Sequence, residues 1–287
     1  MKKLSLAYFG TPDFSARFLE KILNDKGLPV EVRFIVTQED KPVGRNQIIT
    51  PAEVKLIAQK YALPVKTGFV SGLYDIDLAL LFAYGKIISK DFLKAPKYGF
   101  WNIHPSLLPK YRGASPVAAP LTRGDKETGV TIIQMDKEMD HGPIIAQKRV
   151  KILPNERRDE LTNRLTKLAF GLFKRTIGDL IRNQIRTQVQ DDKNATYTKL
   201  LTKKDGYVKR GELKTKSQEE AEKLFNKFRG LYPWPGLWTT IRFKNRDLRL
   251  KIVDVELVGG RLIIKRVKLE GKREVDFNQF NKIYRVF

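Results

Sequence analysis

Two histidines and the polar residues beside them are the clearest chemical signal in this sequence of 287 residues. His104 and His141 are its only histidines, and both fall within residues 100–146. Asn102 lies two residues before His104, and Asp140 lies directly before His141. An amide donor, an imidazole and a carboxylate that meet in space could polarise a carbonyl, move a proton and orient the imidazole. These residue types therefore suggest acyl transfer.

The elements expected around these residues would bring them together. An apolar run at 99–103 predicts a strand, and side chains two apart on a strand, such as those of Asn102 and His104, point to the same face. A second run at 128–134 predicts another strand, which leads toward Asp140. Each residue also has an ordinary structural interpretation, because Asn-x-His can close a turn and an aspartate before His-Gly-Pro can cap one. The spacing alone leaves both interpretations open.

The first half of the chain alternates between apolar runs and segments with helical periodicity. Strands are expected at 4–9, 32–37 and 77–83, and helices at 13–23, 51–61 and 157–184. The run at 77–83 is apolar almost throughout, as is typical of a strand covered on both faces. This alternation predicts a doubly wound, Rossmann-like α/β domain whose ligand crevice lies at the carboxyl ends of its strands.

The chain changes character after residues 187–194, which carry no apolar pattern. One helix is expected at 218–228, and short β-rich runs follow at 237–243, 248–258 and 261–269. This pattern predicts a smaller β-rich domain that resembles an OB-like barrel. In sequence order, the predicted parts are a catalytic domain at 1–186, a linker at 187–199 and the β-rich domain at 200–287.

The formal net charge of +23 is the strongest compositional signal. A surface this positive attracts polyanions such as nucleic acid, or anionic lipid. A general lysine bias of the source proteome would explain the charge equally well. Residues 200–287 hold 22 of the 55 basic and 11 of the 32 acidic residues, so the positive excess is about twice as dense there as in the rest of the chain.

Several classes of protein are excluded by composition. The absence of cysteine rules out disulfides, thiolate zinc sites and cysteine nucleophiles. No stretch approaches about 18 uncharged apolar residues, so no membrane span is expected. The apolar run after the first lysines is too short for a signal peptide. We therefore expect a cytoplasmic protein.

Four motifs stand out along the chain. They are Phe9-Gly10-Thr11-Pro12-Asp13-Phe14, Asn102-Ile103-His104-Pro105-Ser106-Leu107-Leu108-Pro109, Tyr111-Arg112-Gly113-Ala114-Ser115-Pro116 and Met139-Asp140-His141-Gly142-Pro143. Together they closely resemble the folate-dependent formyltransferases, and the resemblance covers nearly the whole chain. The first motif is similar to the branch that formylates methionyl-tRNA. The segment Tyr232-Pro233-Trp234-Pro235-Gly236 resembles the family's C-terminal domain, which the glycinamide ribonucleotide branch lacks.

The resemblance implies a role for each member of the polar cluster. Asn102 would stabilise the oxyanion formed from the formyl oxygen, His104 would assist proton transfer, and Asp140 would orient His104. His141 occupies a position where the family tolerates several residues and is not expected to be catalytic. The formyl donor would be 10-formyltetrahydrofolate, bound as a substrate, and no metal is expected. The residues expected to contact this reduced folate are Tyr84, Gly85, Ser106, Leu107, Leu108 and Pro109.

The acceptor implied by the resemblance is the amino group of methionine carried by initiator tRNA, so that the reaction primes translation. The residues expected to contact tRNA are Arg45, Lys203, Lys204, Lys209 and Arg210. The family commonly has further basic residues directly after the arginine that corresponds to Arg45, whereas this chain has Asn46 and Gln47 there. A monomer is expected.

Two alternatives stay open at this point. The acceptor could be an amino sugar nucleotide, which would keep the chemistry and change the second substrate. The chain could also be a nucleic-acid-binding relative that retains the polar cluster without turnover. The first motif, the loop that carries Arg45 and the basic residues 200–287 disfavour the sugar acceptor. The intact Asn102, His104 and Asp140 disfavour the silent relative.

Overall fold

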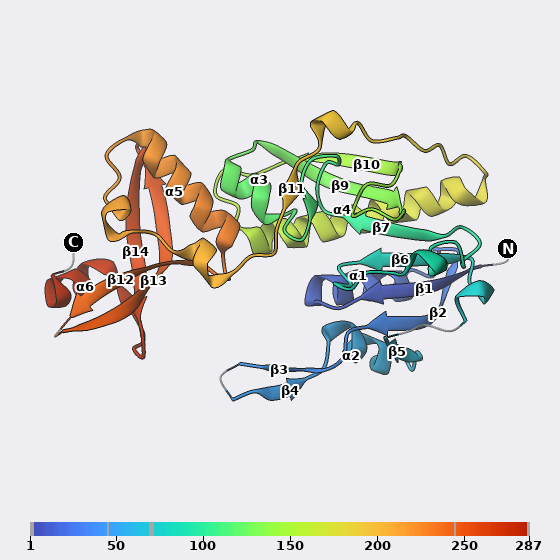
Figure 1. Cartoon of the computed structure of the whole chain (residues 1–287), viewed down its shortest axis with the longest axis horizontal. Helices are drawn as coiled ribbons and strands as arrows, with labels where there is room; N and C mark the ends of the chain where they lie inside the picture. The colour runs from blue at the N-terminus through green and yellow to red at the C-terminus, as the bar shows by residue number, and fades with distance from the viewer. Residues whose placement is uncertain (1–2, 45, 69–71, 244, 286–287) are drawn as a thin grey trace. The chain divides into compact units, whose positions relative to one another are not determined.

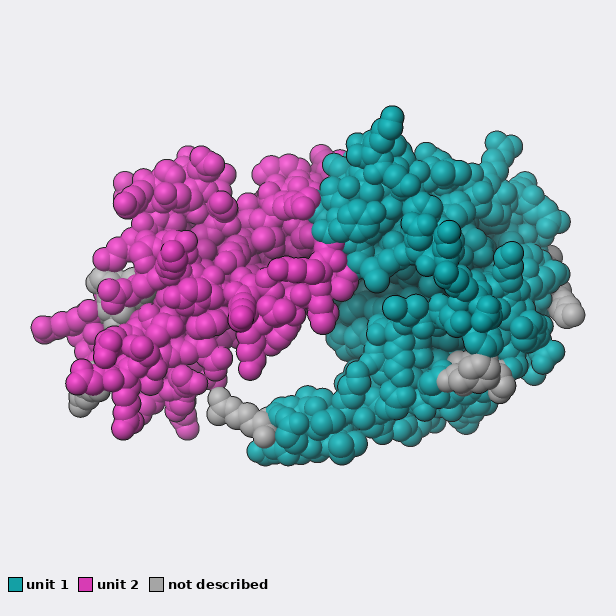
Figure 2. All heavy atoms as spheres, in the orientation of Figure 1, with its two compact units in different colours: residues 1–113, 128–150, 162–197 teal, residues 114–127, 151–161, 198–287 magenta. Residues whose placement is uncertain are grey.

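The computed structural model describes residues 3–44, 46–68, 72–243 and 245–285. The chain divides into two compact units, coloured separately in Figure 2. Unit 1 consists of residues 1–113, 128–150 and 162–197, and unit 2 of residues 114–127, 151–161 and 198–287. Within the described ranges, no helix has the length and apolar character needed to cross a bilayer.

Unit 1 is built on a seven-stranded mixed sheet with the order β10-β9-β7-β6-β1-β2-β5 (Figure 1). Its strands are β1 (Leu4–Gly10), β2 (Val30–Thr37), β5 (Val65–Thr67), β6 (Leu78–Phe82), β7 (Phe100–His104), β9 (Glu127–Gln134) and β10 (Ile144–Lys151). The strands from β5 to β7 are parallel, whereas β9 pairs with β7 in the antiparallel direction. The α/β prediction is confirmed, with a mixed sheet.

One face of this sheet is covered by α1 (Asp13–Asn24) and α4 (Arg158–Ile181). The buried residues of α1 recur at helical spacing, and Phe18 is among them. Its ring stacks on that of Tyr8 of β1. It also contacts the ring of Phe82 of β6 edge-on and the ring of Phe173 of α4 at a tilt. This aromatic cluster fixes the first helix at the carboxyl end of β1.

The other face of the sheet is covered by irregular segments that contain two short 3₁₀ turns, η1 (Leu73–Asp75) and η2 (Lys90–Phe92). Leu73, Leu93 and Ala95 from these segments join one buried cluster with Phe9 of β1 and Phe100 of β7. Both faces of the central strands are thus buried, which explains the almost uniformly apolar run at β6.

The expected strands and helices of the first half are confirmed, with ends that differ by a few residues. Several elements were not anticipated. They include the hairpin of β3 (Lys41–Val43) and β4 (Ile48–Thr50), the helix α6 (Phe277–Tyr284), and the strands β5 and β10. β10 lies at the edge of its sheet and is half-buried or exposed along its length, so its sequence lacks the alternation of a buried strand. The helix α2 (Glu53–Lys60) follows the hairpin.

Unit 2 contains a four-stranded antiparallel sheet, β12-β13-β14-β15 (Figure 1). The strands are β12 (Leu237–Phe243), β13 (Arg246–Val258), β14 (Arg261–Leu269) and β15 (Glu274–Asp276). Alternate residues of β12 and β13 point into a buried core shared with α5 (Gln218–Leu231) and with Phe280 of α6. The turn expected at Gly259 and Gly260 joins β13 to β14, with positive φ at both glycines.

Two short segments from the first part of the chain belong to unit 2. The helix α3 (Ala118–Arg123) packs on α5 so closely that a Cβ atom on Gly230 would lie 2.2 Å from the Thr122 hydroxyl. The buried guanidinium of Arg229 donates to the carbonyls of Leu153 and Glu156. These contacts attach residues 114–127 and 151–161 to the C-terminal part of the chain.

Candidate active site

Asn102, His104 and Asp140 lie together in unit 1, as the sequence predicted. Asn102 and His104 come from β7 and are 8% and 4% exposed. The Asn102 amide donates to Asp140 Oδ1 at 2.9 Å, and His104 Nδ1 lies 3.5 Å from Asp140 Oδ2. The Asp140 carboxylate therefore touches both other members of the cluster.

The route by which Asp140 reaches the cluster differs from the expectation that the strand at 128–134 leads directly to it. Because β9 runs antiparallel to β7, its end lies beside the start of β7, where Met135 donates to the Phe100 carbonyl. The chain then folds back, and Asp140 itself adopts a left-handed backbone conformation with φ of 52°. A tight loop, not a strand end, delivers the carboxylate.

Gly142 explains how tightly this loop can close. A Cβ atom at this position would lie 1.8 Å from the carbonyl oxygen of Gln134, the last residue of β9. The Gln134 N–H in turn donates to the Pro143 carbonyl at 3.0 Å. The loop that carries Asp140 is thus closed at its base by backbone contact, and only glycine fits there.

The backbone of Tyr111 to Gly113 holds His104 and Asp140 from the other side. His104 Nε2 donates to the Tyr111 carbonyl at 2.8 Å, since a carbonyl oxygen can only accept. The Gly113 N–H donates to Asp140 Oδ2 at 2.8 Å. The imidazole is therefore fixed at Nε2 and presents its Nδ1 edge to the carboxylate.

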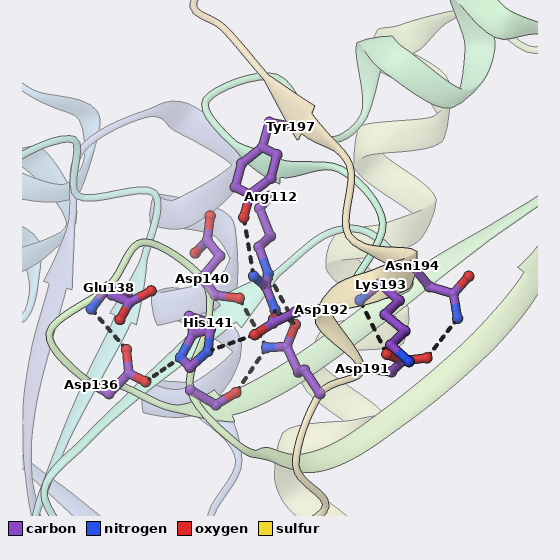
Figure 3. Close-up of polar contacts among 12 residues, drawn as sticks. Arg112, Asp136, Glu138, Asp140, His141, Asp191, Asp192, Lys193, Asn194 and Tyr197 are labelled. Carbon is purple, nitrogen blue, oxygen red and sulfur yellow. Dashed lines mark hydrogen bonds and ion pairs between the residues drawn. The ribbon is translucent and has the colours of Figure 1, made fainter.

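His141 points away from this cluster and takes part in a separate set of ion pairs. Its ring lies between Asp136 and Asp192, at 2.6 Å from Asp136 Oδ2 and 3.3 Å from Asp192 Oδ2 (Figure 3). The hydrogen bond that His141 donates to Asp136, followed by the charges of both aspartates, raises the pKa of His141 above its ordinary value. His141 thus pairs with two carboxylates that lie outside the cluster of Asn102, His104 and Asp140.

Arg112 connects the loop before α3 to the segment around Asp192. The side chain is 2% exposed, and its guanidinium donates to Gln190, to Asp192 and to the hydroxyl of Tyr197. Figure 3 shows Arg112 pointing toward Asp192 and Tyr197. The ion pair with Arg112 is the main cause of a lowered pKa at Asp192. Part of the segment expected to be a linker is therefore hydrogen-bonded to unit 1.

The turn from Ser106 to Pro109 lies directly after β7. The Ser106 hydroxyl donates to the Lys110 carbonyl, and the Leu108 N–H donates to the hydroxyl of Thr131. Ser106 and Leu108 are buried, whereas Leu107 and Pro109 are half-buried. The more accessible surface of this turn is therefore formed by Leu107 and Pro109.

Tyr84 and Gly85, which were expected to contact folate, lie in a second loop that is held through its backbone. The Tyr84 carbonyl accepts from the Thr11 hydroxyl at 2.9 Å and from the Gln38 amide at 2.8 Å. Gly85 has a φ of 78°, a conformation that favours glycine. Two residues from separate segments of the chain thus fix one loop.

A hollow of about 220 Å³ opens beside this loop. Phe9 and Phe100 contribute aromatic surface to it, and Tyr84, Ile87 and Ile88 come from the loop. Phe100 lies two residues before Asn102 on β7, so the hollow adjoins the strand that carries Asn102 and His104. An apolar ring could be buried here with its polar edge toward the loop backbone.

The residues expected to contact tRNA lie apart from the polar cluster in the sequence. Lys203 and Lys204 are exposed on η4 (Lys203–Gly206), and Arg210 is exposed on η5 (Arg210–Leu213) just after the exposed Lys209. Arg45 lies outside the described residues. The hairpin on either side of it exposes apolar side chains at Val43, Ile48 and Ile49.

Sequence reasoning missed the hydrogen-bond partners that come from residues 188–197. Arg112 is part of a quoted motif, but its partner Gln190 follows 78 residues later, in a polar segment with no periodic pattern. A buried glutamine within such a segment carries no signal in a single sequence. Only the fold reveals that Gln190 is 7% exposed and fully engaged.

Comparison with known proteins agrees with this geometry. Residues 2–177 match the family described as formyl transferase. A methionyl-tRNA formyltransferase from Staphylococcus aureus is 36% identical over 262 residues, which cover 88% of this chain and 79% of the relative.

Two solved structures have related folds. One is an N-formyltransferase from Helicobacter canadensis in complex with folinic acid and dTDP-3-aminofucose, with a TM-score of 0.62 and 20% identity over 90% of this chain and 89% of that one. The other is the phosphoribosylglycinamide formyltransferase from Bacillus halodurans, with a TM-score of 0.53 and 26% identity over 62% of this chain and 95% of that one. The family model and the sequence relative together establish that the chain belongs to the formyltransferase family.

Proposed function

We propose that this chain transfers a formyl group from 10-formyltetrahydrofolate to the amino group of methionine carried by initiator tRNA. The observation that carries the proposal is the contact of the Asp140 carboxylate with both Asn102 and His104. The 36% identity to a methionyl-tRNA formyltransferase, over most of both chains, supports the choice of acceptor. The product would prime translation.

In the proposed mechanism, the substrate amine attacks the formyl carbon. A new C–N bond forms as the carbonyl becomes a tetrahedral oxyanion, and the bond from that carbon to the folate nitrogen then breaks. The amine loses a proton and the departing folate nitrogen gains one. The nucleophile belongs to the substrate, so the chain needs to supply only donors and a route for the proton.

Asn102 is suited to stabilise the oxyanion. An amide has two N–H donors, and one of them is held by Asp140 at 2.9 Å. We assign the other to the formyl oxygen, where such a donor typically lowers the barrier by about 3 kcal/mol. His104, fixed at Nε2 by the Tyr111 carbonyl and faced by Asp140 at Nδ1, is assigned the proton transfer.

The reduced folate is assigned to the surface between the two loops that flank β7. The aromatic and aliphatic lining of the hollow beside Tyr84 and Gly85 suits the pterin ring. Ser106 to Pro109 are assigned to the other side, where Leu107 and Pro109 retain accessible surface. Folinic acid in the Helicobacter canadensis enzyme is consistent with a folate donor.

We infer that residues 200–287 form the tRNA-binding domain, which we expect to be related to an OB-like barrel, and that residues 1–186 carry the catalysis. The exposed side chains of Lys203, Lys204, Lys209 and Arg210 suit phosphate contacts, which set affinity without reading sequence. Arg45 is assigned to the same substrate. The antiparallel sheet β12-β13-β14-β15 and its buried core support a separate second domain.

The acceptor can be tested by offering charged initiator tRNA and a dTDP-linked amino sugar to the same enzyme with the same formyl donor. We expect formyl-methionine from the tRNA and no product from the sugar. Formylation of the sugar alone would overturn the proposed acceptor while leaving the chemistry intact.

The tRNA contacts can be tested through their salt dependence. A variant with glutamine at Lys203, Lys204, Lys209 and Arg210 should have a higher KM for tRNA. The slope of log KM against log salt concentration should also fall by roughly one for each phosphate contact that is lost. A control variant removes the same charge from unit 1, at the exposed Lys21, Lys26, Lys90 and Lys94. Equal effects in both variants would assign the salt response to net charge.

A further inference from the structure

Residues 188–197, called the strap here, cross the two loops that hold the catalytic cluster. At one end, Gln188 exchanges two backbone hydrogen bonds with Ile144, at 2.7 and 2.8 Å. At the other end, the Arg112 N–H donates to the Thr196 carbonyl at 2.8 Å, and the Thr196 N–H donates to the Pro109 carbonyl. The strap is thus anchored on both sides of the site.

Gln190 lies in the middle of the strap with its side chain buried, at 7% exposed. Its amide nitrogen donates to the carbonyls of Asp140 at 2.9 Å and Gly142 at 2.8 Å. Its amide oxygen accepts from Arg112 Nε at 3.2 Å and Nη2 at 2.8 Å. Both donors and both acceptor positions of the amide are therefore used.

These bonds join the two backbone segments that position the catalytic pair. One segment carries Asp140, whose carbonyl Gln190 holds directly. The other is the segment around Arg112, where the Tyr111 carbonyl accepts from His104 and the Gly113 N–H donates to Asp140. A single amide connects them, so its loss would let the carboxylate and the imidazole move relative to each other.

We propose that Gln190 is a positioning residue for formyl transfer, which fixes Asp140 against His104 without touching either substrate. The proposal rests on the function assigned above to Asn102, His104 and Asp140. Asp140 is a non-glycine residue in a left-handed conformation, which costs free energy and persists only where surrounding contacts enforce it. The two carbonyl bonds from Gln190 lie directly beside that strained residue.

Two variants at position 190 separate the hydrogen bonds to the Asp140 and Gly142 carbonyls from those with Arg112. Gln190→Leu removes every hydrogen bond of the side chain at similar volume. Gln190→Glu keeps an acceptor for Arg112 but replaces the donors with a carboxylate that faces the Asp140 and Gly142 carbonyls. The matched control is Gln188→Leu, two residues earlier on the strap, where the side chain is exposed.

For each variant we would measure kcat, the KM for each substrate, the single-turnover rate and a thermal melt. Because a shift of about 1 Å in a reacting group can cost about 100-fold in rate, we expect kcat to fall about 10- to 100-fold in both Gln190 variants. Each KM should stay within about twofold, and Gln188→Leu should match the wild type. A purely structural role would instead lower the amount of active enzyme without changing the rate per folded molecule.

Two results would overturn the proposal. One is Gln190→Glu with the wild-type kcat, since the bonds to the carbonyls of Asp140 and Gly142 would then not matter. The other is an unchanged single-turnover rate in the folded fraction of Gln190→Leu. If the leucine variant does not fold, the nearly isosteric glutamate variant decides the question.

Failure of the proposed function would look different. His104→Ala and Asn102→Ala would then retain the wild-type rate, whatever the Gln190 variants do. Loss of activity in those two variants together with a wild-type rate in both Gln190 variants would reject only the positioning role.

Discussion

The side-chain amide of Asn102 donates a hydrogen bond to the Asp140 carboxylate across 2.9 Å. This bond sets the orientation of the amide. An ionised carboxylate can only accept a hydrogen bond, so the amide must turn its nitrogen, not its oxygen, toward Asp140. In the proposed mechanism, the second N–H of Asn102 donates to the formyl oxygen of the substrate. The carboxylate thus orients two groups at once, since it also faces His104.

Replacing this amide by a carboxylate should abolish most of the activity. In Asn102→Asp, the donor is lost and a second negative charge is placed beside Asp140. We expect kcat to fall by about 100-fold or more, as for the loss of an oxyanion donor, with little change in the KM for tRNA. Steady-state kinetics would measure both values. The control Asn155→Asp makes the same charge change at an exposed turn, and an equal loss there would contradict the assignment.

Gly142→Ala should displace the loop that carries Asp140. The added Cβ would meet the Gln134 carbonyl at 1.8 Å, so one backbone segment must move. We expect kcat to fall by about 100-fold, since the carboxylate moves with the loop. Gly171→Ala is the matched control, because it adds a methyl group to the exposed side of α4. Apart from the adjoining helix backbone, no atom of the described residues lies within 4 Å of the added Cβ. That variant should be active and as stable as the wild type or more so.

Loss of the donors to the Tyr84 carbonyl should weaken folate binding. Thr11→Val and Gln38→Leu each remove one hydrogen bond to this oxygen. A net hydrogen bond contributes about 1 kcal/mol, so each variant should raise the KM for the formyl donor by roughly fivefold. The double variant should raise it further, while the KM for tRNA changes less. An unchanged donor KM in the double variant would remove the Tyr84 loop from the folate site.

The ion pairs of His141 should make stability depend on pH. Asp136 and Asp192 face the ring and raise its pKa in the folded chain. The stabilisation is fully present below the unfolded pKa, near 6.5, and is lost as the pH rises through the raised value. His141→Gln should therefore be less stable than the wild type at about pH 6, with a smaller difference at about pH 9. Thermal melts across this range measure the difference, and a constant gap would contradict the ion-pair account.

Much of unit 1 could be predicted from the sequence because its strands are buried on both faces. β6 and β7 read as short apolar runs, and Asn102 and His104 had to share a face once β7 was placed. The pairing direction of β9 was not predictable, since an isolated apolar run carries no direction. The fold-back that brings Asp140 to Asn102 follows from that direction and from Gly142.

The partners from the strap could not be predicted for a different reason. Gln190 and Asp192 lie in a polar stretch without periodicity, and their partner Arg112 is about 80 residues earlier in the chain. Such contacts depend on how the chain crosses the sheet. Local propensity says nothing about them. The helix α6 was not predicted because it is short and begins directly after β15.

The most direct test of the central claim is single-turnover formylation of charged initiator tRNA by the wild type and by Asn102→Ala and His104→Ala. We expect formyl-methionine from the wild type, with rates lower by about 100-fold or more in both variants. Both variants should still retain tRNA, because the proposed tRNA contacts lie elsewhere in the chain. A wild-type rate in His104→Ala, or no product from wild-type enzyme that binds tRNA, would contradict the account.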